Sequence, residues 1–168
     1  ADAGQHAELC PRDGLGGAPA ERRIVTHGGR HLGLCPGPAE RGPIALGFSS
    51  IFWNTAWTNG QAPHTLGILC DPEHAAFAQF PTETHSNWQW WYPVRHAAPM
   101  ILDGLPKELQ PIVQVIDDWF TNRKLGLVFE ARVGRGRLLV TSIDLDDAVL
   151  DPVRRQLRAS LLAYGASA

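Results

Sequence analysis

Hydrophobic and polar positions follow two different patterns along the chain, and the pattern changes near residue 43. Residues 1–43 are built mainly from Gly, Ala, Pro, Arg and His, and the glycines and prolines interrupt both the helix period and the strand period. From residue 44 onward apolar runs alternate with amphipathic segments, and every Phe, Trp and Tyr lies between Phe48 and Tyr164. We therefore predict an irregular, poorly ordered segment over residues 1–43 and one packed domain over residues 44–168.

Apolar runs rich in β-branched and aromatic residues predict the strands. Four short runs lie at residues 44–52, 65–70, 100–102 and 112–116. The clearest pattern comes later, where residues 125–133 and 137–143 flank the turn sequence Gly134-Arg135-Gly136. That arrangement predicts an antiparallel hairpin.

Capping residues predict two short helices. Asp71 as N-cap and Pro72 as the first helical residue begin a helix that ends near Phe80. Asn87 caps a second helix that runs through Tyr92. Both helices lie between predicted strands, so the order of elements alternates as in an α/β layered fold.

The last helix has the strongest pattern. Asp151 is its predicted N-cap, Pro152 its first residue and Gly165 its stop. Its apolar positions form one stripe that can cover a sheet, made of Val153, Leu157, Leu161 and Tyr164. The expected architecture is therefore a mainly parallel sheet with helices on it, modified by the C-terminal antiparallel hairpin and closed by this helix.

Composition bounds the function more than the fold. A length of 168 residues with 44% hydrophobic content suits one domain with a sizeable core. The formal net charge of −2 argues against a nucleic-acid partner held by phosphate neutralisation. No run approaches the ~18 apolar residues of a membrane span, so we expect a soluble protein without a membrane partner, in a compartment that the sequence does not indicate. The three cysteines form no C-x-x-C pair, which disfavours a zinc cage.

Several motifs occur in a fixed order after residue 44. They are Phe-Trp-Asn at 52–54, His-Thr-Leu-Gly at 64–67, Phe-Pro-Thr at 80–82 and His-Ser-Asn-Trp-Gln-Trp-Trp at 85–91, then residues 111–120, 142–144 and 152–164. Together they resemble the C-terminal accessory domain of family 2 glycoside hydrolases, the β-galactosidase-like enzymes. The resemblance covers about residues 44–164 and implies a flavodoxin-like or glutamine-amidotransferase-like α/β fold.

Two departures from that family qualify what the resemblance implies. Residues 1–43 do not match the opening strand and helix of the accessory domain, so we expect a fold truncated at its N-terminus, as in a fragment of a larger gene. The resemblance also does not extend to the barrel domain, which carries the catalytic glutamates of such enzymes. No glycosidase residue is therefore carried over to this chain.

Aromatic residues are the first candidates for ligand binding. Trp88, Trp91 and Tyr92 stand at i, i+3 and i+4 and so share one helix face, while Trp90 points elsewhere. Sugars stack on such rings, and the predicted substrate-binding residues are Trp53, Asn54, Trp57, Trp88, Gln89, Trp90 and Trp91. The alternative, and the commoner case for a stripe at helical spacing, is that these rings cover the sheet as core. A surface-exposed tryptophan beside Asn54 or Gln89 would favour carbohydrate binding.

Histidines and aspartates are the catalytic candidates. If the fold brings His64 and His85 beside Asp117 and Asp118, the group could activate water as a general base or through a divalent metal. The alternative is that the histidines bond to loop carbonyls and that the two aspartates form a helix cap and a surface ion pair with Arg123 and Lys124.

A second acidic group offers oxygen ligands of the kind that Ca²⁺ prefers. It contains Asp144, Asp146 and Asp147, whereas Asp151 is assigned to helix capping. The group lacks the glycine and the closing glutamate of an EF-hand loop. The expected cofactor is therefore none, or Ca²⁺ or another divalent cation if these aspartates bind one.

Three functions remain open from the sequence, of which one is a carbohydrate-binding module, which requires exposed coplanar tryptophans with polar neighbours. The other two are as follows. The first is a non-catalytic accessory domain, associated with carbohydrate, that packs against other domains of a larger enzyme or forms a homodimer through an unpaired sheet edge. The second is a small hydrolase of esters, lactones or glycosides that uses the histidines and aspartates named above, with or without a metal. Convergence of those side chains in the fold would favour the second.

Overall fold

The computed structural model describes residues 23–27, 30–34, 44–47, 65–134, 136–145 and 151–167. Six of the predicted functional residues lie outside these ranges, namely Trp53, Asn54, Trp57, His64, Asp146 and Asp147. Most of residues 1–43 and of the strand predicted over residues 44–52 lie outside them as well.

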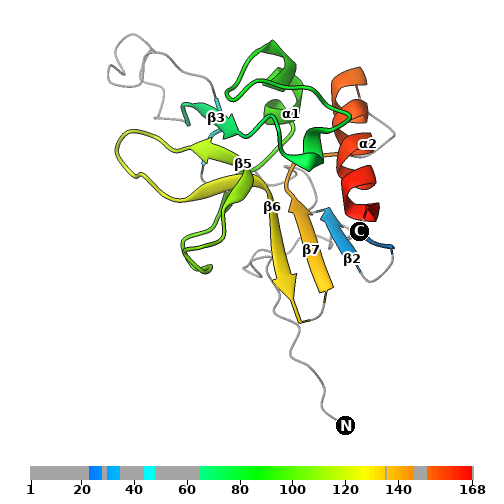
Figure 1. Ribbon diagram of the computed structural model, residues 1–168. Coiled ribbons are helices and arrows are strands. Elements are labelled where there is room, and N and C mark those ends of the chain that lie inside the picture. The colour runs from blue at the N-terminus through cyan, green and yellow to red at the C-terminus, as the bar shows by residue number, and fades with distance from the viewer. Residues whose placement is uncertain are drawn as a thin grey trace, which may run out of the picture.

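The described residues form a seven-stranded sheet (Figure 1). Its strand order is β1 (Arg23–His27), β2 (Arg30–Leu34), β7 (Gly136–Thr141), β6 (Leu125–Val133), β5 (Pro111–Ile116) and β3 (Gly67–Cys70), with β4 (Met100–Ile101) paired to β6. Every pair is antiparallel except β2 with β7. β1 and β2 lie in the segment for which the sequence pattern predicts no strand.

The prediction of a flavodoxin-like or glutamine-amidotransferase-like α/β fold is wrong, because the sheet is mainly antiparallel. Neighbouring parallel strands need a crossover of about a dozen residues or more. Only residues 117–124 separate β5 from β6, and only residues 134–135 separate β6 from β7. These short connections return the chain directly beside itself, and Gly134 supports the second one with a φ of +58°, which glycine adopts without steric cost.

Four helical segments accompany the sheet in the described part of the chain. Two are single 3₁₀ turns, η1 (Ala75–Phe77) and η2 (Trp88–Trp90), and α1 (Trp91–Arg95) continues directly from η2. The predicted N-cap of the second helix is confirmed, since the Asn87 side chain accepts a hydrogen bond from the Gln89 N–H. The helix predicted to begin after Asp71 is only the turn η1, whose cap is His74.

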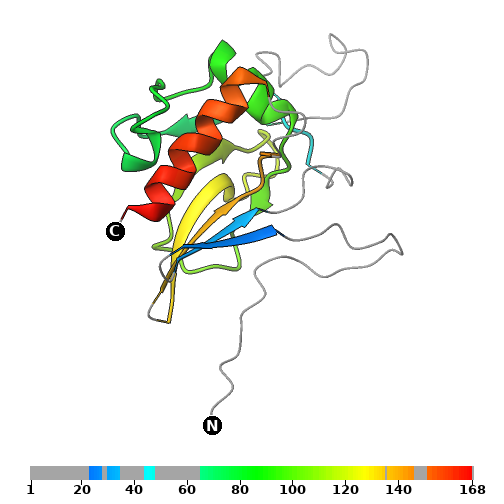
Figure 2. The ribbon, with the colours of Figure 1, turned by 90° about the vertical axis from the view of Figure 1, so that its right-hand side faces the viewer.

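The C-terminal helix α2 (Pro152–Ala166) is confirmed with its predicted N-cap, Asp151, which accepts from the N–H groups of Val153 and Arg154. The helix lies across one face of the sheet (Figure 2). Ser160, which is buried, ties α2 to η1 because its Oγ donates to Ala76 O at 2.7 Å and accepts from Gln79 N at 3.1 Å.

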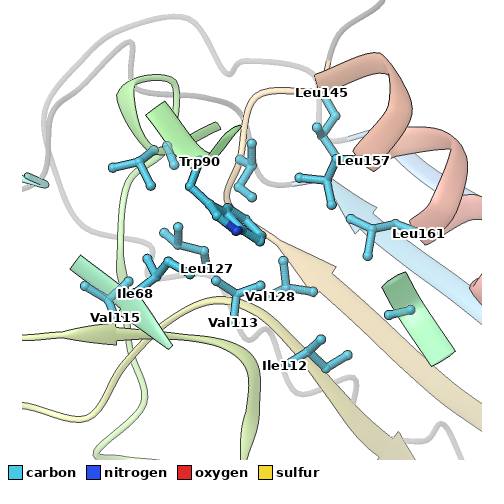
Figure 3. Close-up of a cluster of buried hydrophobic side chains, with 14 of the residues drawn as sticks. Ile68, Trp90, Ile112, Val113, Val115, Leu127, Val128, Leu145, Leu157 and Leu161 are labelled. Atoms are coloured by element: carbon cyan, nitrogen blue, oxygen red, sulfur yellow. The ribbon is translucent and has the colours of Figure 1, made fainter. Parts of the chain in front are cut away.

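The main core fills the space between α2 and the sheet (Figure 3). Trp90 lies in it, fully buried, with Phe77 and Phe80 set edge-on at centroid distances of 6.1 and 5.5 Å. Its indole N–H donates to Thr82 Oγ1 at 2.7 Å, so the one polar atom of the ring is satisfied. Two of the stripe residues of α2, Leu157 and Leu161, are fully buried in the same cluster. Trp90 therefore anchors the segment around residue 88 to the sheet.

The outer edge of β3 is occupied by residues 84–85. Leu69 and His85 form an antiparallel bridge, and the Cys70 N–H donates to Thr84 O at 2.9 Å. The Cys70 thiol also donates to Glu83 O at 3.1 Å. The segment that leads into η2 is thus fixed along this edge of the sheet.

Candidate functional site

An exposed aromatic cluster lies on η2 and α1, and we call Trp88, Trp91, Tyr92 and Arg95 the Trp88 surface. Trp88 is 83% exposed and Tyr92 is 49% exposed, although both are large apolar side chains. The rings of Trp88 and Trp91 lie 5.6 Å apart at an interplanar angle of 59°. The Arg95 guanidinium sits over Trp91, with its Cζ atom 5.2 Å from the ring centroid.

Trp88 and Trp90 are neighbours in the chain, but their side chains lie on opposite sides of this segment. Trp90 points into the core, while Asn87 and Gln89 hold the turn. The Gln89 side chain donates to Pro81 O at 2.9 Å. Of the substrate-binding candidates that the structure describes, Trp90 and Gln89 therefore serve the fold, Trp88 is exposed and Trp91 is half-buried.

A polar cluster stands just before Trp88 in the chain. The Glu83 carboxylate accepts from Asn87 Nδ2 at 3.2 Å, and His85 Nε2 lies 3.5 Å from the same Oε2 atom. The other ring nitrogen of His85 is 3.3 Å from Thr84 Oγ1. These side chains are exposed or half-buried, so they offer hydrogen-bonding groups to a ligand at the surface.

The structure separates His85 from the aspartates expected beside it. His85 pairs with Glu83, whereas Asp117 accepts hydrogen bonds from Arg123 N and Arg123 Nε, both at 2.7 Å, and from Arg123 Nη2 at 2.9 Å. Its Oδ1 also accepts from the Asp118 N–H at 2.7 Å. The bonds from Arg123, acting against burial, lower the pKa of Asp117 from 3.8 to about 2. A carboxylate so stabilised is a poor general base, and the ion pair with Arg123 was the alternative left open by the sequence.

Asp117 and Asp118 build a turn that presents two aromatic side chains. Asp118 Oδ1 accepts from Phe120 N and Thr121 N, both at 2.9 Å. Trp119 is 66% exposed and Phe120 is 69% exposed. Sequence reasoning missed this pair, although an Asp that precedes two aromatics by one and two residues is a signal for a side-chain-capped turn.

The one predicted metal ligand that the structure describes is held by an arginine. Asp144 Oδ2 lies 3.7 Å from Arg154 Nη1, and the same guanidinium donates from Nε to Asp151 Oδ2 at 2.7 Å. Within the described ranges, no group of three or more His, Cys, Asp or Glu side chains has the arrangement of a metal site. Arg95 was also missed, although it stands four residues after Trp91, the spacing at which helix side chains meet.

The fold and its surface define a class: a mainly antiparallel sheet domain with one covering helix and an exposed tryptophan cluster at its edge. The chain belongs to the family described as Domain of unknown function (DUF8487), whose model matches residues 20–168. Among curated proteins, none matches the sequence. No helix in the part of the chain that the structure describes has the length and apolar character of a membrane span.

Proposed function

We propose that this domain is a non-catalytic accessory domain that binds carbohydrate through the Trp88 surface. The observation that carries the proposal is the Trp88 indole, a large apolar ring left 83% exposed beside further aromatic and polar groups. A role beside a catalytic domain is proposed from the motifs of residues 44–164 alone, since the fold that their resemblance to family 2 glycoside hydrolases implied is not the observed one. Packing against such a domain, or a homodimer, belongs to the same proposal.

The energetics of stacking suit a sugar ring. A pyranose laid on one face of an indole removes about 100 Å² of apolar surface from water, which contributes about 2–3 kcal/mol. Hydroxyl groups at the rim of the sugar then find acceptors and donors in Glu83, His85 and Asn87, which precede Trp88 in the chain. Glu83 and His85 are already exposed, so using these two side chains to bind a ligand costs little reorganisation.

The tilt between the two tryptophans limits the shape of the ligand. Rings set at 59° do not form one flat platform. Successive sugars stacked on Trp88 and Trp91 would need to turn relative to each other. The geometry therefore favours soluble, flexible oligosaccharides over the flat face of a crystalline polymer.

The hydrolase hypothesis remains the alternative, with esters, lactones or glycosides as its substrates. No observation on the described residues favours it, because His85, Asp117 and Asp144 are each engaged by a different partner. Hydrolysis of a chromogenic panel by the purified chain, with and without chelator, tests it directly. Turnover that is lost in His85→Ala would replace the accessory-domain proposal.

Calorimetric titration with oligosaccharides of different linkage and charge tests the proposed function. We expect binding of at least one of them, and a loss of about 30-fold or more in affinity for Trp88→Ala, from the 2–3 kcal/mol of stacking given above. Trp119→Ala is the matched control, since it removes another exposed indole at a different loop and should bind as the wild type does. No binding to any oligosaccharide, or equal binding by Trp88→Ala, would overturn the proposal.

A further inference from the structure

The charge of the Trp88 surface points to the class of sugar. We infer that the ligand carries a carboxylate, as a uronic acid does, and that Arg95 binds it. This inference rests on the proposed function and adds a specificity-determining residue to it. The cluster Trp88, Trp91 and Arg95 then supplies both parts of the recognition, an aromatic face for the ring and a cation for its acid group.

Arg95 is placed for this role by its contact with Trp91. Its Cζ atom lies 5.2 Å from the Trp91 ring, and Trp91 in turn contacts Trp88 at 5.6 Å. Trp91 therefore contacts both the indole proposed to carry the sugar and the guanidinium proposed to bind its acid group.

The donors of Arg95 are available. Arg95 is exposed, and within the described part of the protein its guanidinium makes no hydrogen bond and no ion pair. This distinguishes it from Arg123, Arg137 and Arg154, each of which is paired with a carboxylate. Contact with the indole restricts the side chain without consuming its N–H donors. The guanidinium fork matches a carboxylate in bidentate geometry.

Charges on the other side of Trp88 are consistent with one orientation of the ligand. Glu83 precedes Trp88 in the chain, and its Oε2 atom accepts from Asn87 Nδ2 at 3.2 Å and lies 3.5 Å from His85 Nε2. A carboxylate on the ligand is repelled from Glu83 and attracted to Arg95. The acidic group of the sugar therefore points toward α1, and neutral hydroxyl groups face Glu83.

The experiment compares tetragalacturonate with its fully methyl-esterified form, in which a methyl group removes the charge of each carboxylate; both are titrated against the folded chain at neutral pH. We expect the acid to bind about ten- to a hundred-fold more tightly than the ester, because a charge-assisted bidentate bond is involved. Added salt should weaken binding of the acid and leave that of the ester nearly unchanged. Arg95→Gln should remove the preference, and Arg95→Lys, which keeps the charge without the fork, should retain part of it.

The outcomes separate the inference from the proposed function. Equal affinity for acid and ester, or an acid preference that survives in Arg95→Gln, overturns the role of Arg95 but leaves carbohydrate binding at Trp88 in place. Loss of both ligands in Trp88→Ala, together with loss of the preference alone in Arg95→Gln, supports both. No binding of either ligand or of any neutral oligosaccharide overturns both.

Discussion

We expect removal of the ion pair between Asp117 and Arg123 to lower the free energy of unfolding by a clearly measurable amount. The Asp117 side chain is only 1% exposed and accepts four hydrogen bonds, three of them from Arg123. Asp117→Asn keeps the shape but turns an amide N–H₂ group toward donors that need an acceptor. The same change removes one of the two carboxylates to which the Arg123 guanidinium donates, the other being Asp118 at 3.2 Å.

The pKa gives the size of the effect. A drop from 3.8 to about 2 corresponds to about 2 kcal/mol of stabilisation at neutral pH. The mismatch of the asparagine amide adds to this, whereas the partial exposure of Arg123 lets water replace some bonds. We expect Asp117→Asn to lower the free energy of unfolding by about 2–3 kcal/mol at pH 7.

The effect depends on pH with a definite sign. Because the folded pKa lies below the unfolded one, the stabilisation is complete above about pH 4 and is lost as the pH falls toward 2. Between pH 5 and pH 3 the contribution of Asp117 to the free energy of unfolding should fall by about 1 kcal/mol in the wild type. Asp117→Asn has no carboxyl group at this position, so its free energy of unfolding should not show this loss.

Urea denaturation followed by tryptophan fluorescence at pH 7, 5 and 3 measures both quantities. Glu73→Gln is the control, because it removes an exposed carboxylate and should change the free energy of unfolding by less than about 0.5 kcal/mol. The reasoning is refuted if Asp117→Asn is as stable as this control at pH 7, or if its stability falls with pH as steeply as that of the wild type.

Two further predictions concern the packing of α2 and the chemistry of the thiol. Ser160→Ala removes the two hydrogen bonds of the Ser160 hydroxyl, one to Ala76 in η1 and one to Gln79 just after it, and should lower the free energy of unfolding by about 1–3 kcal/mol in the same urea assay; wild-type stability would show that these bonds contribute nothing. Burial, with the nearby Asp71 charge, raises the pKa of Cys70 from 9.0 to about 11. In a variant with Cys10 and Cys35 changed to Ser, the folded protein should therefore react with a disulfide reagent at pH 8 about a hundred-fold more slowly than the urea-unfolded one. Equal rates would contradict this.

Local features of the fold could be predicted because their signals are local. The hairpin of β6 and β7 and the cap of α2 at Asp151 are each specified by a few adjacent residues, and the structure confirms both. Strand direction has no such signal. The order of predicted strands and helices is the same whether a connection crosses over to a parallel strand or turns back to an antiparallel one. The connections at residues 117–124 and 134–135 are too short for a crossover, so the strands that they join are antiparallel.

The candidate site was predictable in part for the same reason. Helical spacing correctly separates Trp90 from Trp88 and Trp91, but which face meets the sheet depends on residues distant in sequence, such as Leu157 and Leu161. The partner of Asp117 was one of the two alternatives from the sequence, since Arg123 lies only six residues away. The ion pair of His85 is with Glu83, two residues before it, and His64 lies outside the described residues.

The segment at residues 84–85 has a consequence for assembly. Residues 84–85 bond to the outer edge of β3, so a strand of another molecule cannot pair there. Short covering segments protect the edges of natural sheets from aggregation in the same way. Of the two ends of the strand order, the one left for a homodimer that continues the sheet is β1. Self-association and ligand binding would then occupy opposite ends of the sheet, so that a dimer could present two separate tryptophan surfaces and bind one polysaccharide chain with both.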